Sequence, residues 1–120
     1  MVKLTCLLKR KPGLTPEEFH AYWRNHHGPL MAATNSGSYV FRYEQNPKPL
    51  SSYQGEADDG YDGVTVQWFE SMADYEASVS APDVGDVMAD VAKFLDVDHL
   101  EFVVTENPFV VIDGAVPPGA

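Results

Sequence analysis

Hydrophobic and polar residues alternate along four stretches of the chain, a pattern typical of strands that bury one face. In the first stretch Val2, Leu4, Cys6 and Leu8 share a face, and in the second an aromatic face is formed by Tyr39, Phe41 and Tyr43. The alternation predicts strands over residues 2–9, 38–46, 63–70 and 99–107.

A helix is predicted after the first strand, where a capping signal precedes an aromatic-rich stretch. Thr15 suits the N-cap and Pro16 the first helical position, and Glu18 stands three residues after Thr15, as a capping box requires. We expect this helix to run to about His27 and to end at Gly28-Pro29.

A second helical region is predicted between the last two strands. Ser71 caps a short helix that reaches about Val79, and Pro82 opens a further helical piece. In that piece the apolar residues fall on one stripe, formed by Val84, Val87, Met88, Val91 and Leu95.

The order strand, helix, strand, strand, helix, strand predicts an α+β fold of the ferredoxin-like βαββαβ type. Its four-stranded antiparallel sheet carries helices on one face only. The other face has no cover, although apolar and aromatic residues stand on it among charged ones. An exposed patch of this kind usually marks an interface, so we predict a homodimer in which two sheets pack face to face.

Three further segments stand outside these elements. The polar stretch 47–63 is longer than a usual connection, which favours a lid or a binding loop. Residues 109–112, Phe-Val-Val-Ile, are apolar enough to pair with a strand, either within the subunit or across to a partner. Residues 113–120 are expected to form a frayed tail.

Length and charge limit the classes of function. The 120 residues suffice for one domain with a real core, and 18 acidic against 8 basic residues give a net charge of −10. This charge repels phosphate backbones and anionic lipid, so we expect no nucleic-acid partner and no membrane partner. No signal peptide or spanning segment is recognisable, and Cys6 is the only cysteine, so a cytoplasmic location is predicted.

The candidate chemistry lies in residues 20–30, His-Ala-Tyr-Trp-Arg-Asn-His-His-Gly-Pro-Leu. On a regular helix Phe19, Tyr22, Trp23 and His26 form the buried arc, and His27 sits at its edge. An edge position suits a proton-transferring imidazole, so His27 is the first catalytic candidate and His26 the second. The structural alternatives are an imidazole that caps the last carbonyls for His27 and a satisfied core imidazole for His26.

Aromatic and basic residues supply the candidates for substrate binding. Tyr22, Trp23 and Tyr61 are aromatic with a polar tip, and Trp68 and Arg42 stand on predicted strands. Aromatic residues at strand or helix spacing are more often core than ligand contacts. For Arg42, pairing with Glu44 or Glu101 is favoured over holding a ligand carboxylate or phenolate.

Metal and nucleotide sites are not expected. Asp98, His99 and Glu101 could be mistaken for ligands, but on a strand Asp98 points away from the other two, and no second cluster completes a set. No glycine-rich phosphate-binding signature is present.

Four segments in order resemble the EthD family: Trp23 with His27-Gly28-Pro29-Leu30, and residues 43–46, 61–71 and 92–107. The resemblance implies an EthD-like domain over residues 1–112 and a dimeric α/β barrel, as in the superfamily of small monooxygenases, polyketide cyclases and haem-degrading proteins. Its haem-binding members use a histidine on the second helix, and this chain has none between Ser71 and Leu95. We therefore expect no cofactor, with haem as the alternative that would need unusual ligation.

The resemblance and the residues together predict a protein that acts on a small hydrophobic or aromatic metabolite without metal or organic cofactor. Oxygenation, cyclisation and dehydration would all use the same parts. The alternative is a binding protein that carries a hydrophobic compound for a separate oxidative enzyme of ether or xenobiotic degradation. A third reading is a structural dimer with a vestigial pocket.

Overall fold

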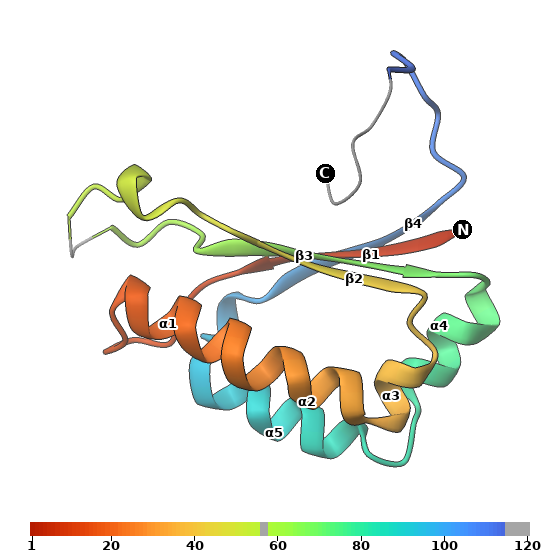
Figure 1. Ribbon diagram of the computed structural model, residues 1–120, viewed down its shortest axis with the longest axis horizontal. Helices are drawn as coiled ribbons and strands as arrows, with labels where there is room; N and C mark the ends of the chain where they lie inside the picture. Colours follow the sequence, from red (N-terminus) through yellow and green to blue (C-terminus); the bar gives the residue numbers. More distant parts are fainter. Residues whose placement is uncertain (56–57, 115–120) are drawn as a thin grey trace.

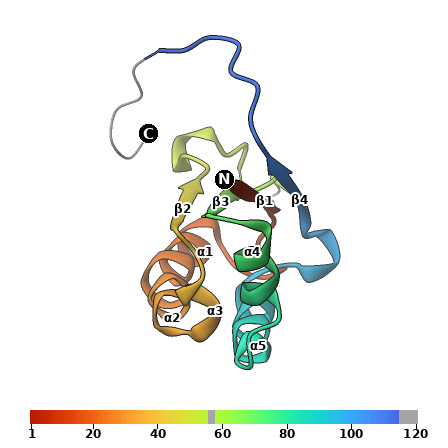
Figure 2. The same ribbon diagram turned by 90° about the vertical axis from the view of Figure 1, so that its right-hand side faces the viewer.

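The computed structural model describes residues 1–55 and 58–114 and shows two layers, a sheet and a set of helices packed on one of its faces. Both views show the same division, with the α-helices on one side of the sheet and the segment that follows the last strand on the other (Figure 1 and Figure 2). The ferredoxin-like α+β fold is therefore confirmed.

The sheet has four antiparallel strands in the order β2-β3-β1-β4. Their bounds are β1 (Val2–Leu8), β2 (Arg42–Pro47), β3 (Gly63–Phe69) and β4 (Glu101–Glu106). The helical layer contains α1 (Pro16–Tyr22), the π-helix η1 (Trp23–His27), α2 (Gly28–Ala33), α3 (Asn35–Ser38), α4 (Met72–Val79) and α5 (Val84–Phe94). Two short 3-10 turns, η2 (Leu50–Ser52) and η3 (Val97–His99), lie in the connections.

The start of the first helix forms as its sequence predicts. The Thr15 hydroxyl accepts the Glu18 N–H at 3.1 Å, and the Glu18 carboxylate accepts the Thr15 N–H at 3.0 Å. The two bonds close a capping box, with Pro16 in the first turn. Ser71 caps α4 in the same way by accepting the Asp74 N–H.

The predicted end of that helix at Gly28-Pro29 is wrong. The chain passes through the π-helical turn η1, in which the Gly28 N–H donates to the Trp23 carbonyl, and then continues as α2. Pro29 lacks an N–H, and it falls in the first turn of α2, directly after the wide turn. The wide turn therefore lets one long helical rod run past a Gly-Pro pair.

Two other expectations change in detail. The second strand begins at Arg42 rather than at residue 38, because residues 35–38 form α3, so Tyr39 and Phe41 stand outside the strand and are exposed. In α5 the buried stripe is Val87, Asp90, Val91 and Phe94, whereas Met88 is exposed at 49%.

The main apolar core lies between the sheet and the helices. It is formed by Leu8, Phe19, Trp23, Met31, Val87, Val91, Phe94 and Leu95. The Trp23 ring packs against Gly63, where a side-chain carbon would come within 2.7 Å of the indole. The close approach of ring and backbone explains why a glycine begins β3.

The connection between β2 and β3 is fastened by a buried carboxylate. Asp62 is 1% exposed and accepts hydrogen bonds from the Arg10 guanidinium at 2.7 Å and from the Tyr53 hydroxyl at 2.7 Å. Lys48 pairs with Asp58 in the same connection at 2.9 Å. These bonds hold the described part of the long polar stretch against the end of β1.

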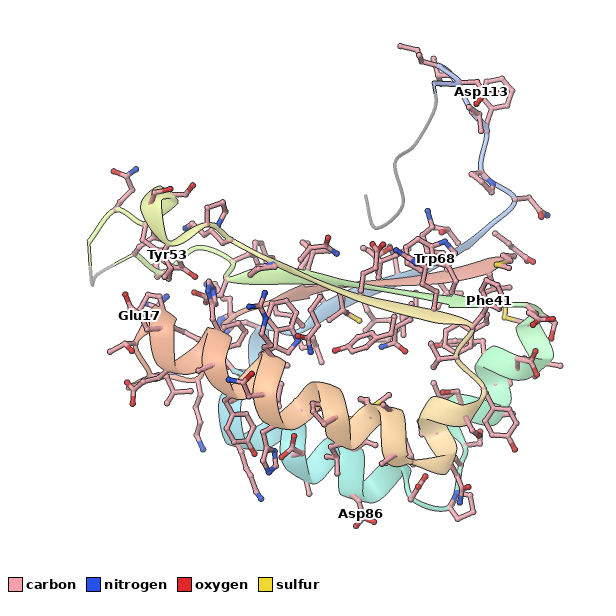
Figure 3. The ribbon with its side chains drawn as sticks, in the orientation of Figure 1. Glu17, Phe41, Tyr53, Trp68, Asp86 and Asp113 are labelled. Carbon is pink, nitrogen blue, oxygen red and sulfur yellow. The ribbon has the colours of Figure 1, made fainter. Side chains whose placement is uncertain are left out.

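The sheet face opposite the helices stays uncovered in the single chain. Leu7, Val64, Val66 and Val103 stand on it with Trp68, which Figure 3 shows on that side of the sheet. Beyond β4 the chain rises on the same side, toward Asp113, and Phe109 to Ile112 form no strand and are between 60% and 91% exposed. Of the predicted tail 113–120, residues 115–120 lie outside the described residues.

We predict that Gly63→Ala lowers the free energy of unfolding by about 1–3 kcal/mol, because the new methyl group would press on the Trp23 ring. Urea denaturation of the purified protein measures it. The matched control is Gly85→Ala in α5, where a side-chain carbon meets no atom within 4 Å and which we expect to stabilise the helix slightly. Equal effects of the two substitutions would contradict the packing of Trp23 on Gly63.

Candidate functional site

Four polar side chains meet where the π-helical turn packs against α5. The Asp90 carboxylate accepts the Tyr22 hydroxyl at 2.5 Å on one oxygen and contacts His27 Nδ1 at 2.8 Å through the other. His26 Nδ1 lies 3.3 Å from the first oxygen, and its ring stacks on Tyr22 at 4.6 Å between centroids. We call Tyr22, His26, His27 and Asp90 the Asp90 cluster.

The two neighbouring histidines exchange the positions expected for a regular helix. His27 is buried at 7% exposure, whereas the His26 side chain is 57% exposed. The π-helical turn is the reason, because each of its residues advances the chain through a smaller angle than in an α-helix. Side chains after Trp23 are therefore rotated back, which brings His27 under the helix and turns His26 outward.

The protonation of the cluster follows from burial and hydrogen bonding. Burial lowers the pKa of His27 and outweighs the opposing effect of Asp90, so the imidazole is neutral near neutral pH. Burial raises the pKa of Asp90, but the hydrogen bonds from Tyr22 and His27 more than offset it, and the net pKa is lowered. Burial and then the Asp90 carboxylate raise the pKa of Tyr22 to about 12.

This protonation state fixes the tautomer of His27. A neutral imidazole next to a carboxylate carries its proton on Nδ1, which donates to Asp90, and leaves Nε2 as an acceptor. Among the described residues no group forms a hydrogen bond with His27 Nε2, and this atom keeps some contact with solvent. The pair has the arrangement of a general base held in orientation by a carboxylate.

The other predicted binding residues do not join this cluster. Trp23 is in the core, 2% exposed. Arg42 pairs with Glu44 at 2.6 Å and lies over the Trp68 ring, and both stand on the uncovered sheet face. Tyr61 lies near Lys9 and Glu101, just beyond the C-terminal end of β1. The pairing of Arg42 with Glu44, favoured from the sequence, is confirmed.

Asp90 was not among the residues predicted from the sequence. It stands three residues after Val87 and four before Phe94, so it interrupts an apolar stripe with an acidic side chain. A carboxylate at such a position is rarely buried without a partner. The same spacing, considered together with the histidines of the other helix, was the signal that could have found it.

Two hollows open at the surface near the start of α1. The larger, about 750 Å³, lies between the β1–α1 turn and the β2–β3 connection and includes Arg10, Tyr53 and Asp62 in its wall. The smaller, about 360 Å³, is lined by His20, Ala21, Trp23, Arg24, Asn25, Gln45, Pro47 and Leu50.

Within residues 1–55 and 58–114, no group of three or more His, Cys, Asp or Glu side chains is placed to hold a metal ion. In the same part of the chain, no helix has the length and apolar character needed to cross a membrane.

The profile of the EthD domain matches residues 11–98, which is most of the chain and includes both halves of the Asp90 cluster. The chain belongs to the EthD family. No curated protein matches the sequence of this EthD protein.

Solved structures share the fold of this EthD protein at low sequence identity. An ethyl tert-butyl ether D family protein from Bacillus halodurans has 18% identity and a TM-score of 0.66 over 90% of this chain and 99% of that one. A dimeric ferredoxin-like protein of unknown function from Bacteroides fragilis has 15% identity and a TM-score of 0.63 over 88% of this chain and 95% of that one. SnoaB, a cofactor-independent oxygenase from Streptomyces nogalater, has 10% identity and a TM-score of 0.60 over 93% of this chain and 97% of that one.

We predict that Asp90→Asn lowers the free energy of unfolding at pH 7 by about 1–3 kcal/mol, because the half-buried Tyr22 hydroxyl and the buried His27 Nδ1–H lose a charged acceptor. Since the pKa of Asp90 is lowered on folding, its contribution is present above the unfolded pKa and disappears as the pH falls through the folded pKa. Denaturation curves at several pH values should therefore converge for wild type and variant in acid. Asp86→Asn, on the exposed side of α5, is the control (Figure 3). A pH-independent difference would contradict the pairing.

Proposed function

We propose that this EthD protein abstracts a proton from a small hydrophobic or aromatic metabolite, with His27 as the general base. The observation that carries the proposal is the buried His27–Asp90 pair with Nε2 unpartnered among the described residues. Because burial lowers the pKa of His27, its imidazole is neutral at cellular pH and available to accept a proton. The reaction class would be proton removal from an acidic C–H or O–H group, the first step of cofactor-free oxygenation, cyclisation or elimination.

The rest of the cluster supports this role. Asp90 holds the imidazole in one tautomer and stabilises the imidazolium that forms when Nε2 takes a proton. Tyr22 shares the carboxylate and limits its movement. His26 stacks on Tyr22, and its side chain is 57% exposed, so in this proposal it is the group through which a proton passes to water. One structural relative is named a cofactor-independent oxygenase, which fits this class of chemistry.

The protein is proposed to act as a homodimer in the cytoplasm. Leu7, Val64, Val66 and Val103 give the uncovered sheet face an apolar centre, and the exposed Phe109 to Ile112 rise on the same side. A second copy placed on this face would remove both from water. A relative of the same fold is described as dimeric, and a single cysteine suits a reducing compartment.

A second candidate function is carriage of a hydrophobic compound without conversion. The observation in its favour is that the Asp90 cluster also joins two helices, so it would be useful to the fold alone. Incubation with a hydrophobic metabolite extract separates the two functions. Carriage predicts that the bound compound leaves with its mass unchanged.

We predict that His27→Gln slows the exchange of the methyl protons of acetophenone with deuterated water by at least about 100-fold relative to wild type. Acetophenone is an aromatic ketone whose methyl protons are weakly acidic, and mass spectrometry measures the exchange. His99→Gln is the matched control, because that exposed histidine pairs only with Asp96. If His27→Gln exchanged the probe as fast as wild type, His27 would not be the base.

We predict that Val66→Glu converts a dimer into a monomer, because it places a second carboxylate opposite Glu44 in the middle of the uncovered face. Sedimentation velocity measures the change, and circular dichroism shows that the fold remains. The control is Ala89→Glu on the exposed side of α5. Val66→Glu sedimenting as the wild type does would argue against the sheet face as the interface.

A further inference from the structure

The space between sheet and helices has buried side chains at both ends and half-buried polar ones in its middle. Toward the helices the cross-strand rows of the sheet read Leu8-Gly63, then Phe102-Cys6-Thr65-Gln45, then Val104-Leu4-Gln67-Tyr43, and finally Glu106-Val2-Phe69. Leu8, Gly63, Val2 and Phe69 are buried. In the two middle rows only Thr65 is buried, and on β2 and β3 the polar side chains of Gln45, Gln67 and Tyr43 keep part of their surface accessible. The helical layer therefore does not cover these polar side chains completely.

The Tyr43 hydroxyl is able to donate a hydrogen bond into this region. Its oxygen accepts a hydrogen bond from Gln45 Nε2 at 3.2 Å. The orientation of that amide is settled, since Nε2 also donates to the Trp23 carbonyl at 2.8 Å. Among the described residues no group accepts the Tyr43 O–H proton. Burial raises the pKa of Tyr43, so the phenol stays protonated and able to donate.

A second donor nearby has no acceptor. Trp23 Nε1 is the one fully buried side-chain nitrogen or oxygen without a hydrogen-bond partner among the described residues. The indole is close enough to lower the pKa of Tyr43 somewhat, but it makes no hydrogen bond of acceptable geometry with it. An orphaned buried N–H costs free energy, and a ligand or a water that accepts it recovers that loss.

Gln67 completes the group. It stands directly across from Tyr43 in the register of β2 and β3, so the two side chains are neighbours on the same face. Its amide makes no hydrogen bond with any described residue. Tyr43, Gln67 and Trp23 thus present three donors to one region, and only the Gln67 carbonyl offers an acceptor.

We propose that Tyr43, Gln67 and Trp23 form a binding site between the layers for the oxygen of a small aromatic phenol or ketone. Three donors favour an oxygen that only accepts, as a carbonyl or a phenolate does. The adjoining ring of Trp23 and the half-buried side chain of Leu4 provide apolar surface for the aromatic part.

The site deepens the proposed function and rests on it for its catalytic meaning. Gln45 bonds the Trp23 carbonyl inside the π-helical turn and lies against Gly28, so it ties β2 to the turn that carries His27. Donors that bind the substrate oxygen would stabilise the negative charge that forms when His27 removes a proton. Binding itself, however, requires only the three donors and can be measured without turnover.

The experiment uses 4-nitrophenol as the probe and nitrobenzene as its partner without a hydroxyl group. The chain has two tryptophans, and Trp68 stands on the opposite face of the sheet, so its indole N–H is an internal reference. In two-dimensional ¹⁵N NMR of the full chain, titration with 4-nitrophenol is expected to move the Trp23 indole signal downfield and leave that of Trp68 in place. Trp68→Phe assigns the two signals.

Variants locate the contact. Tyr43→Phe, which keeps the ring and removes the donor, is expected to weaken 4-nitrophenol about tenfold and to leave nitrobenzene unchanged. Gln67→Leu should act in the same direction. Tyr39→Phe, which changes an exposed tyrosine outside the strand, is the control and should bind as the wild type does.

Two results would overturn the site. One is a Trp23 signal that stays fixed at saturating probe, or a probe that does not bind, and the other is equal affinity in Tyr43→Phe and Tyr39→Phe. His27→Gln separates this outcome from failure of the proposed function. If it binds 4-nitrophenol normally and still exchanges acetophenone at the wild-type rate, the binding site stands and the catalytic role of His27 falls.

Discussion

The π-helical turn at Trp23–His27 is the constraint on which the rest of the structure depends. Its one wider turn lets the helical rod continue through Gly28 and Pro29, and it places both Trp23 and His27 on the inner side. Gln45 holds the turn to the sheet by bonding the Trp23 carbonyl, which also accepts the Gly28 N–H. A regular α-helix over the same residues would have placed His26, rather than His27, in the buried arc. Both imidazoles reach Asp90, and backbone geometry rather than residue type decides which of them is buried there.

The interior differs in polarity and burial from one end of the strands to the other. Leu8, Phe19 and Phe94 at one end, and Val2 with Phe69 at the other, supply the hydrophobic stabilisation that a chain of this size needs. The rows between them carry Tyr43, Gln45 and Gln67, which the helices cover incompletely. Trp23 belongs to the core and also contributes to the proposed binding site. The Asp90 cluster is a third region, joined to the proposed site through the π-helical turn and through Gln45.

Much of this fold follows from the sequence, and the reasons for the exceptions are local. Alternation predicted β1, β3 and β4, and the capping box fixed the start of α1. In β1 and β3 the reason is that the buried residues, among them Val2, Leu8 and Phe69, share the face toward the helices. The second strand began later than alternation alone predicted, since residues 35–38 form α3 and Tyr39 and Phe41 after it are exposed in the single chain. The π-helical turn has no pattern of its own, so the positions of His26 and His27 were exchanged. Asp90 was missed because a carboxylate on an apolar stripe becomes understandable only when the partner helix is known to face it.

The contact between Trp23 and Gly63 has a consequence for how such a protein can diverge. The two positions are 40 residues apart in sequence but share one volume, because the indole fills what a side chain on β3 would otherwise occupy. Drift at one position is therefore not independent of the other: a descendant that acquires a methyl group on the strand would need a slimmer ring on the helix. Homologous chains are expected to change at this pair together, large with small, while the summed bulk of the two stays nearly constant.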